Sequence, residues 1–234
     1  VAEISAALDR IAAARGIDVP IHVDAASGGM VAPFLQPELA WDFRVDRVAS
    51  INTSGHKYGL VYPGLGWIVW REEAALPESM VFRVSYLGGD LPTLALNFSR
   101  PGAQVLLQFY LFLRLGREGY AEVQGESQRV ALHLSEAIGA MEAFELISDG
   151  STIPVFAWRL RAGHTENWDL YDLSDRLRMR GWLVPAYPMP DDLAEITVQR
   201  IVVRNGLTMD LADALLDVMR EETAYLDALT SPLP

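Results

Sequence analysis

Apolar side chains along the first third of the chain follow a helical pattern and then form short runs. Residues 3–15 carry apolar side chains every three or four positions, which predicts a helix, and Gly16 follows where a C-terminal cap belongs. Three short apolar runs come next, at 17–23, 45–51 and 66–70. Short runs separated by longer polar segments favour strands of a mostly parallel sheet that is buried on both faces.

Two helical stretches, at about 102–117 and about 120–143, are long enough to connect two lobes. The pattern then changes to short strands between helices. The elements predicted there are strands at 155–161, 182–186 and 197–204, a helix from Leu170 to Gly181 and a last helix from Asp210 onward. This order predicts an antiparallel sheet backed by helices. We place the domain boundary within 115–145 and divide the chain into 1–126 and 127–234.

Composition narrows the class of protein. The chain has 234 residues, of which 50% are hydrophobic and 21% charged, so it can bury a core. A net charge of −12 argues against nucleic acid or an anionic membrane surface as the main partner. The lack of cysteine excludes a disulfide scaffold, thiolate–zinc sites and cysteine nucleophiles, and we predict no metal site. No apolar stretch approaches the roughly 20 residues of a membrane span, so none is predicted.

Two predicted strands end in polar segments, and ligands of open α/β sheets bind outside the carboxyl ends of the strands. Asp24 ends the first of them and Lys57 follows the second. A pyridoxal phosphate site needs a lysine amine that forms a Schiff base and a carboxylate that keeps the pyridine nitrogen protonated. Ala26 is small enough for a flat ring to approach. Ser54 and His56 could donate hydrogen bonds to a phosphate.

Each of these residues also has an ordinary structural interpretation. An aspartate at a strand end is commonly a turn or cap residue. Lys57 is the sole lysine of the chain, and a lone lysine is commonly a solvated surface residue. His22, which is close to Asp24 in the chain, is more commonly a packing group or a group that supports a site residue than a catalyst. The combination, rather than any single residue, points to the cofactor.

A longer set of motifs makes the pattern specific. They are IHVDAASGG at 21–29, WDFR at 41–44, SIN at 50–52, SGHKYGL at 54–60, GWIVWR at 66–71, YLGG at 86–89, NFSR at 97–100, LGREGY at 115–120 and GWLVPAY at 181–187. In this order they resemble the glutamate decarboxylases of bacteria and plants over essentially the whole chain. The resemblance implies an α/β fold, namely part of a fold type I pyridoxal phosphate-dependent transferase. Residues 1–126 would be the carboxyl-terminal part of the large domain, with its mostly parallel sheet and helices, and 127–234 a small α+β domain.

The resemblance also implies roles for the residues at the strand ends. Lys57 would form the Schiff base and Asp24 would pair with the pyridinium. Ala26 would pack on the ring, while Ser54 and His56 would reach the phosphate. The implied reaction converts L-glutamate to 4-aminobutanoate (GABA) and carbon dioxide. It consumes a proton, which fits the family's association with acid resistance.

Further residues are implied to act at a subunit interface or on the substrate. Ser99 resembles the serine that contacts the phosphate bound in the neighbouring subunit, and residues 86–96 resemble a mobile loop near the substrate. Arg204, last in the alternating run, resembles the arginine that binds a substrate carboxylate, and a guanidinium suits that task. Arg200 and Arg204 could instead form surface or interlobe ion pairs. The family implies a cytoplasmic homo-oligomer, a dimer or larger, that acts on a small-molecule substrate.

The family's chains are much longer than this one. We therefore expect the chain to be a carboxyl-terminal half that is inactive or poorly folded by itself, because a sheet without all its strands leaves edges and an apolar face open. Three other interpretations stay open. They are a pyridoxal phosphate decarboxylase for another amino acid, a carbon–carbon lyase resembling sphingosine-phosphate lyase, and a non-catalytic truncated module that only makes subunit contacts.

Overall fold

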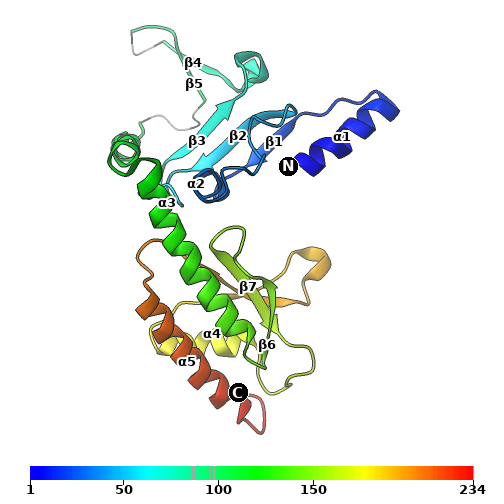
Figure 1. The fold of residues 1–234 in the computed structure, drawn as a ribbon, viewed down its shortest axis with the longest axis vertical. Coiled ribbons are helices and arrows are strands. Elements are labelled where there is room, and N and C mark those ends of the chain that lie inside the picture. The colour runs from blue at the N-terminus through cyan, green and yellow to red at the C-terminus, as the bar shows by residue number, and fades with distance from the viewer. Residues whose placement is uncertain (86–87, 95, 97–98, 234) are drawn as a thin grey trace. The chain divides into compact units, whose positions relative to one another are not determined.

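The computed structural model describes residues 1–85, 88–94, 96 and 99–233 (Figure 1). The chain forms two compact units, residues 1–121 and residues 122–234. One long helix, α3 (Ala103–Gly139), belongs partly to each unit. None of the helices in the described part of the chain has the length and apolar content to cross a bilayer.

The first unit contains a helix, a three-stranded sheet and a small hairpin. Its elements are α1 (Ala2–Arg15), β1 (Ile21–Asp24), α2 (Ala32–Leu35), β2 (Val48–Ser54), β3 (Gly66–Trp70), β4 (Phe82–Val84), β5 (Leu91–Thr93) and the start of α3. Helix α1 confirms the predicted helix, and Gly16 caps it in the left-handed conformation with a φ of 68°. Strands β1, β2 and β3 confirm the three predicted strands. Helix α2 and the β4–β5 hairpin are too short to leave a periodic signal in the sequence.

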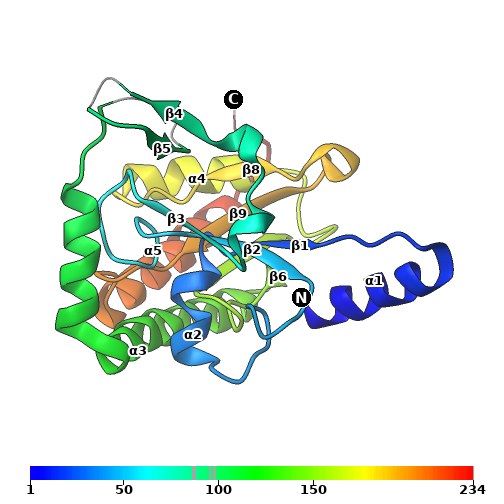
Figure 2. The same cartoon turned by 90° about the horizontal axis from the view of Figure 1, so that it is seen from above.

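Strand β2 is the central strand of the sheet (Figure 2). Strand β1 runs parallel to it, with Asp24 opposite Asn52, whereas β3 runs antiparallel, with Gly66 opposite Ser54. Strand β3 is thus the exception to the mostly parallel sheet that the sequence predicts. Parallel neighbours need a crossover of about a dozen residues or more, usually a helix. The link 55–65, all of it described, contains no helix.

Apolar side chains of the first unit remain exposed on α1 and β3. None of the residues of α1, which is described in full, is buried; Ile4 is 58% exposed and Ile11 is 41% exposed. On β3, Ile68 and Val69 are exposed as well. The buried cluster of this unit is small and consists of Ala25, Val45, Val48 and Ile51. The described residues therefore cover these apolar side chains only in part.

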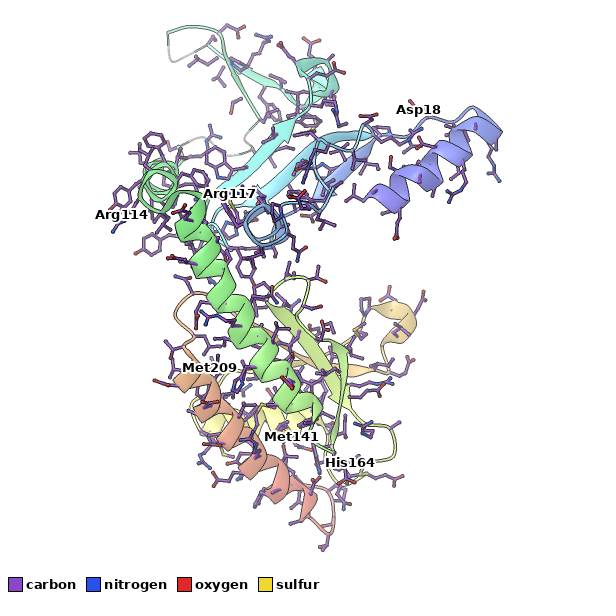
Figure 3. All side chains as sticks on the ribbon, viewed as in Figure 1. Asp18, Arg114, Arg117, Met141, His164 and Met209 are labelled. Carbon is purple, nitrogen blue, oxygen red and sulfur yellow. The ribbon has the colours of Figure 1, made fainter. Side chains whose placement is uncertain are left out.

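Helix α3 breaks at Gly116, whose φ of 58° and ψ of −162° are not helical. Glycine takes this conformation without steric cost, since it has no Cβ. Arg114 and Arg117 lie on either side of the break (Figure 3). The break confirms the prediction of two successive helices. The second one ends at Gly139 rather than at 143, because the chain turns there into a strand that the sequence does not predict.

The second unit is an antiparallel sheet packed against helices. Its elements are the end of α3, β6 (Phe144–Ser148), β7 (Val155–Leu160), α4 (Leu170–Met179), β8 (Ala186–Pro188), β9 (Thr197–Val202) and α5 (Met209–Asp227). The strand order is β6-β7-β9-β8 and every neighbouring pair is antiparallel, as predicted. Leu134 of α3, Leu173 of α4 and Leu216 of α5 are buried in one core with Phe156 and Trp158 of β7.

The strand predicted at 182–186 is wrong in its position, since β8 begins only at the last of these residues. The carbonyl oxygen of Val184 accepts hydrogen bonds from the side chains of Ser174, over 2.8 Å, and of Gln199, over 3.0 Å. Side chains rather than a neighbouring strand therefore satisfy the Val184 carbonyl oxygen. Strand β9 also ends two residues before the predicted end at 204.

Candidate active site

One face of the first sheet is polar where β1 and β2 end. Because side chains alternate between faces along a strand, the paired residues place His22 and Asp24 of β1 on one face with Ser50, Asn52 and Ser54 of β2. His22 Nδ1 lies 2.8 Å from the Ser50 hydroxyl oxygen, so His22 supports the strand pair. The carboxyl ends of these parallel strands are where ligands of α/β sheets bind.

Asp24 presents an exposed carboxylate that is held in its ionised form. The Ala26 amide donates to Asp24 Oδ1 over 3.1 Å. Asn52 donates a further hydrogen bond to this carboxylate, while its own Oδ1 accepts from the Ala25 amide over 3.2 Å. The Ala26 hydrogen bond, then that of Asn52, lowers the pKa of Asp24, and the charge of Lys57 adds to the effect. Asn52 thus orients Asp24, a role that only the strand register reveals.

Lys57 lies in a tight loop, 55–59, that directly follows β2. Its side chain is exposed and makes no hydrogen bond or ion pair with any residue that the structure describes. The Leu65 carbonyl oxygen anchors the loop by accepting from the Gly55 amide, over 3.1 Å, and from His56 Nδ1, over 2.9 Å. His56 Nε2 is therefore the nitrogen left for a ligand, and it can donate only when the ring is protonated.

The structure brings five of the seven predicted site residues together. The Ser54 amide donates to the Ala26 carbonyl oxygen over 3.1 Å, and the Lys57 amide donates to the Ser54 carbonyl oxygen over 3.2 Å. Asp24 joins them through the Ala26 amide and through its charge interaction with Lys57. His56 lies in the same loop. The Ser54 hydroxyl makes no hydrogen bond within the described ranges, so it is available to a ligand.

Ser99 is exposed and has no hydrogen-bond partner among the residues that are described. Part of the predicted loop 86–96 lies outside the described residues, and so do residues 97 and 98 of the motif around Ser99. The described part of that loop includes β5, which pairs with β4 in the hairpin. The roles of Ser99 and of the loop therefore stay predictions.

Arg204 belongs to the second unit and lies two residues beyond β9. Its side chain is exposed and forms no ion pair or hydrogen bond within the described part of the chain. Arg200 lies on the same exposed side of the strand, with its guanidinium carbon 5.7 Å from the ring centroid of Tyr187. Neither arginine forms the surface ion pair that was the alternative to a binding role, as far as the described residues show.

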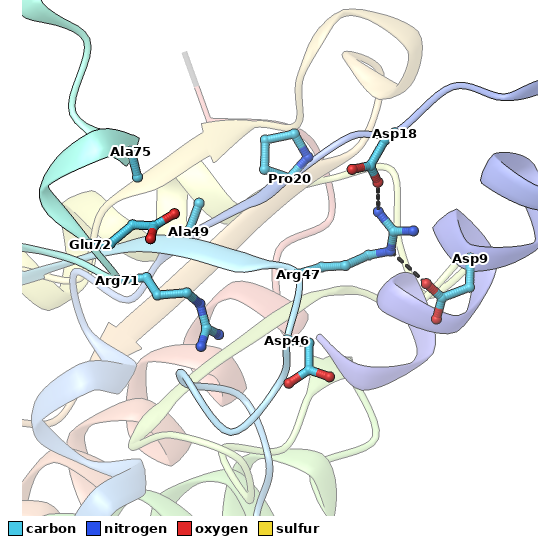
Figure 4. Close-up of a pocket in the computed structure, with 9 residues that line it drawn as sticks. All are labelled: Asp9, Asp18, Pro20, Asp46, Arg47, Ala49, Arg71, Glu72 and Ala75. Atoms are coloured by element: carbon cyan, nitrogen blue, oxygen red, sulfur yellow. Dashed lines mark hydrogen bonds and ion pairs between the residues drawn. The ribbon is translucent and has the colours of Figure 1, made fainter.

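A charged pocket in the first unit is lined by none of the predicted site residues (Figure 4). Its two guanidinium groups are already satisfied. Arg47 donates to Asp9 over 2.7 Å and also pairs with Asp18. Arg71 donates to three backbone carbonyl oxygens, over 2.7, 2.7 and 3.1 Å. Arg71, the last residue of the GWIVWR motif, thus holds the backbone at the start of β2.

The side chains at the ends of β1 and β2 fit pyridoxal phosphate. An exposed amine, Lys57, interacts electrostatically with an ionised carboxylate, Asp24, and a free hydroxyl and a ring nitrogen lie next to the amine in the chain. The small Ala26 stands beside the carboxylate. This fold and this set of groups are typical of pyridoxal phosphate-dependent enzymes of the α/β class.

Comparison with known proteins names the family. The pyridoxal-dependent decarboxylase conserved domain matches residues 1–161. Glutamate decarboxylase from Lactococcus lactis subsp. cremoris is 50% identical over 211 residues, which make up 90% of this chain and 45% of that protein. The chain belongs to the pyridoxal-dependent decarboxylase family, so the predicted family and cofactor are confirmed.

Solved structures agree with this assignment. The glutamate decarboxylase of Lactobacillus brevis matches with a TM-score of 0.89 and 47% identity, over 97% of this chain and 52% of that one. A sphingosine-1-phosphate lyase from Burkholderia pseudomallei shares the fold, with a TM-score of 0.73 at 24% identity over 94% of this chain and 48% of that one. The predicted fold class is confirmed. The chain spans about half the length of the curated relatives it matches.

Proposed function

We propose that this chain takes part in the decarboxylation of L-glutamate to 4-aminobutanoate and carbon dioxide. The observation that carries the proposal is the exposed Lys57, which interacts electrostatically with the ionised Asp24 where β1 and β2 end. Glutamate is supported over other amino acids by the 50% identity to a glutamate decarboxylase. Residues 1–126 would contribute to the cofactor-binding domain and 127–234 would form the small domain.

Pyridoxal phosphate, when bound, supplies an aldehyde for the Lys57 amine and an electron sink for the carbon that loses carbon dioxide. Asp24 holds a proton on the pyridine nitrogen, because an adjacent anion raises that nitrogen's affinity for a proton. Ala26 leaves space for a flat ring. The Ser54 hydroxyl and the His56 side chain would form hydrogen bonds with phosphate oxygens.

Two residues act outside this group in the proposal. Arg204 binds a carboxylate of the substrate, because a guanidinium and a carboxylate can form two parallel hydrogen bonds. Its guanidinium is exposed and has no partner among the residues that the structure describes, which supports this role. Ser99 contacts the phosphate bound in a neighbouring copy of the chain, which requires at least a dimer. A cytoplasmic homo-oligomer is part of the same proposal and rests on the family resemblance.

The experiment uses the protein as its gene encodes it, with pyridoxal phosphate added. We expect a visible absorbance band from the bound cofactor and release of carbon dioxide from glutamate, but not from aspartate or aromatic amino acids. Lys57→Ala should lose both. Lys57→Arg is the matched control: it keeps the positive charge at position 57 but not the reactive amine, so it should lose the band as well.

The outcomes separate the alternatives. A cofactor band with turnover of a different amino acid would assign the chain to another decarboxylase of the family. A band without turnover of any amino acid would favour the non-catalytic module. A wild-type protein without a band, or a band that survives in Lys57→Ala, would overturn the proposed role of Lys57.

A further inference from the structure

Two buried polar side chains of α3 meet at the carbonyl oxygen of Gly59, the last residue of the loop that carries Lys57. Gln108 Nε2 donates to this oxygen over 2.9 Å and to the Tyr120 hydroxyl over 2.9 Å. The Tyr120 hydroxyl donates to the same carbonyl oxygen over 3.1 Å. Gln108 is 0% exposed and Tyr120 is 1% exposed, so water does not compete for these hydrogen bonds.

The Gln108 amide fits this place in one orientation only. A carbonyl oxygen can only accept, so the atom that faces Gly59 must be the nitrogen of the amide. Its oxygen, Oε1, then lies against the loop: a Cβ on Gly55 would stand 2.5 Å from it and a Cβ on Gly59 would stand 2.7 Å from it. Glycine at both ends of the loop is what lets the Gln108 side chain approach this closely.

The break in α3 makes the arrangement possible. Residues 12 positions apart in a straight helix are separated by about 18 Å along its axis, at about 1.5 Å a residue. Because the helix turns at Gly116, Gln108 from one side and Tyr120 from the other reach the same oxygen. The Tyr120 ring is stacked on Phe34 of α2, with the ring centroids 4.9 Å apart. Burial raises the pKa of Tyr120, so its hydroxyl keeps the proton that it donates.

We propose that Gln108 and Tyr120 are positioning residues that hold the Lys57 loop through the Gly59 carbonyl oxygen and so fix the position of Lys57. The inference rests on the proposed function of Lys57. The Leu65 carbonyl oxygen fixes the start of the loop, and the Gln108–Tyr120 pair fixes its end. Between these anchors, Lys57 is the only exposed residue of 55–59, all of which are described.

Two single variants of the protein as its gene encodes it test the proposal. Gln108→Met keeps the length and burial of the side chain but removes its donors, and Tyr120→Phe keeps the stacked ring but removes the hydroxyl. We expect glutamate turnover per bound cofactor to fall about tenfold in each, because small displacements of a reacting group are costly. KM for glutamate should not change, since the pair holds Lys57 rather than the substrate.

A double variant and a matched control sharpen the test. Gln108→Met combined with Tyr120→Phe should lose little more than the worse single variant, because both side chains act on one carbonyl oxygen. Gln104 lies one helical turn before Gln108 and donates to the Pro63 carbonyl oxygen over 3.0 Å, outside the Lys57 loop. Gln104→Met should therefore leave turnover per bound cofactor unchanged.

Normalising to bound cofactor separates positioning from folding. A variant that only weakens the fold binds less cofactor, but the turnover and the cofactor circular dichroism, each divided by the amount of bound cofactor, stay at the wild-type level. A variant that misplaces Lys57 lowers both the turnover and the circular dichroism per bound cofactor. If one variant binds no cofactor, the other supplies the same test. Wild-type turnover and circular dichroism per bound cofactor would overturn this inference, whereas a wild-type protein that binds no cofactor would overturn the proposed function instead.

Discussion

Replacing Gly59 with alanine tests how closely the loop that carries Lys57 is packed. In Gly59→Ala, the new Cβ would stand 2.5 Å from the Gly55 carbonyl oxygen and 2.7 Å from Gln108 Oε1. Ordinary contact begins at 3.4 Å, so one partner must move by about 0.9 Å, the difference between 2.5 and 3.4 Å. The Gly55 oxygen belongs to the backbone and accepts from the Val61 amide over 3.3 Å, so the loop itself must shift.

A shift of this size next to the reacting amine should be costly. Misplacing a catalytic group by about 1 Å can lower an enzyme's rate by about a hundredfold, and we expect that loss in Gly59→Ala. The assay is carbon dioxide release from glutamate, divided by the amount of cofactor bound. The matched control is Gly102→Ala, because no described residue apart from its own chain neighbours would lie within 4 Å of its new Cβ. Wild-type turnover per bound cofactor in Gly59→Ala would refute the argument that close packing positions Lys57.

Three further predictions concern charged groups. The pKa of Asp24 lies below its ordinary value of 3.8, so the ionised carboxylate stabilises the folded state. The free energy of unfolding of the wild type should therefore exceed that of Asp24→Asn by its full amount above pH 3.8. This difference should shrink as the pH falls through the lowered pKa, as measured by urea unfolding at acid pH. Arg204→Lys keeps the charge but loses a two-point contact, so KM for glutamate should rise about tenfold while the cofactor band stays unchanged; an unchanged KM would remove Arg204 from the substrate site. Glu222 is 1% exposed and accepts from Arg176 over 2.6 Å and from Arg180 over 2.7 Å. Glu222→Gln should lower the free energy of unfolding by about 2 kcal/mol, less than for a fully buried pair because both arginines are partly exposed; an unchanged urea midpoint would contradict this.

Local pattern alone determined much of the molecule. The spacing of apolar residues before Gly16 specifies α1, and the bulky apolar side chains at every second position, Phe156, Trp158 and Leu160, specify β7. The break of α3 near Gly116 is visible as an interruption between two helical patterns. Asp24 and Lys57 could be paired in advance because parallel strands end at one edge of their sheet, which brings together residues far apart in the chain. The motifs around them were enough to identify the family.

Only the tertiary structure decided which distant groups contact Asp24 and the loop that carries Lys57. Asn52 becomes the partner of Asp24 through the register of β1 on β2, and β3 takes its direction from a link without a helix. Gln108 and Tyr120 meet at Gly59 only because α3 bends between them. A periodic pattern records which face of its own element a residue occupies. It carries no information on the register between strands, on the angle at which a helix bends, or on which backbone oxygen a side chain contacts. These three features together determine the surroundings of Lys57.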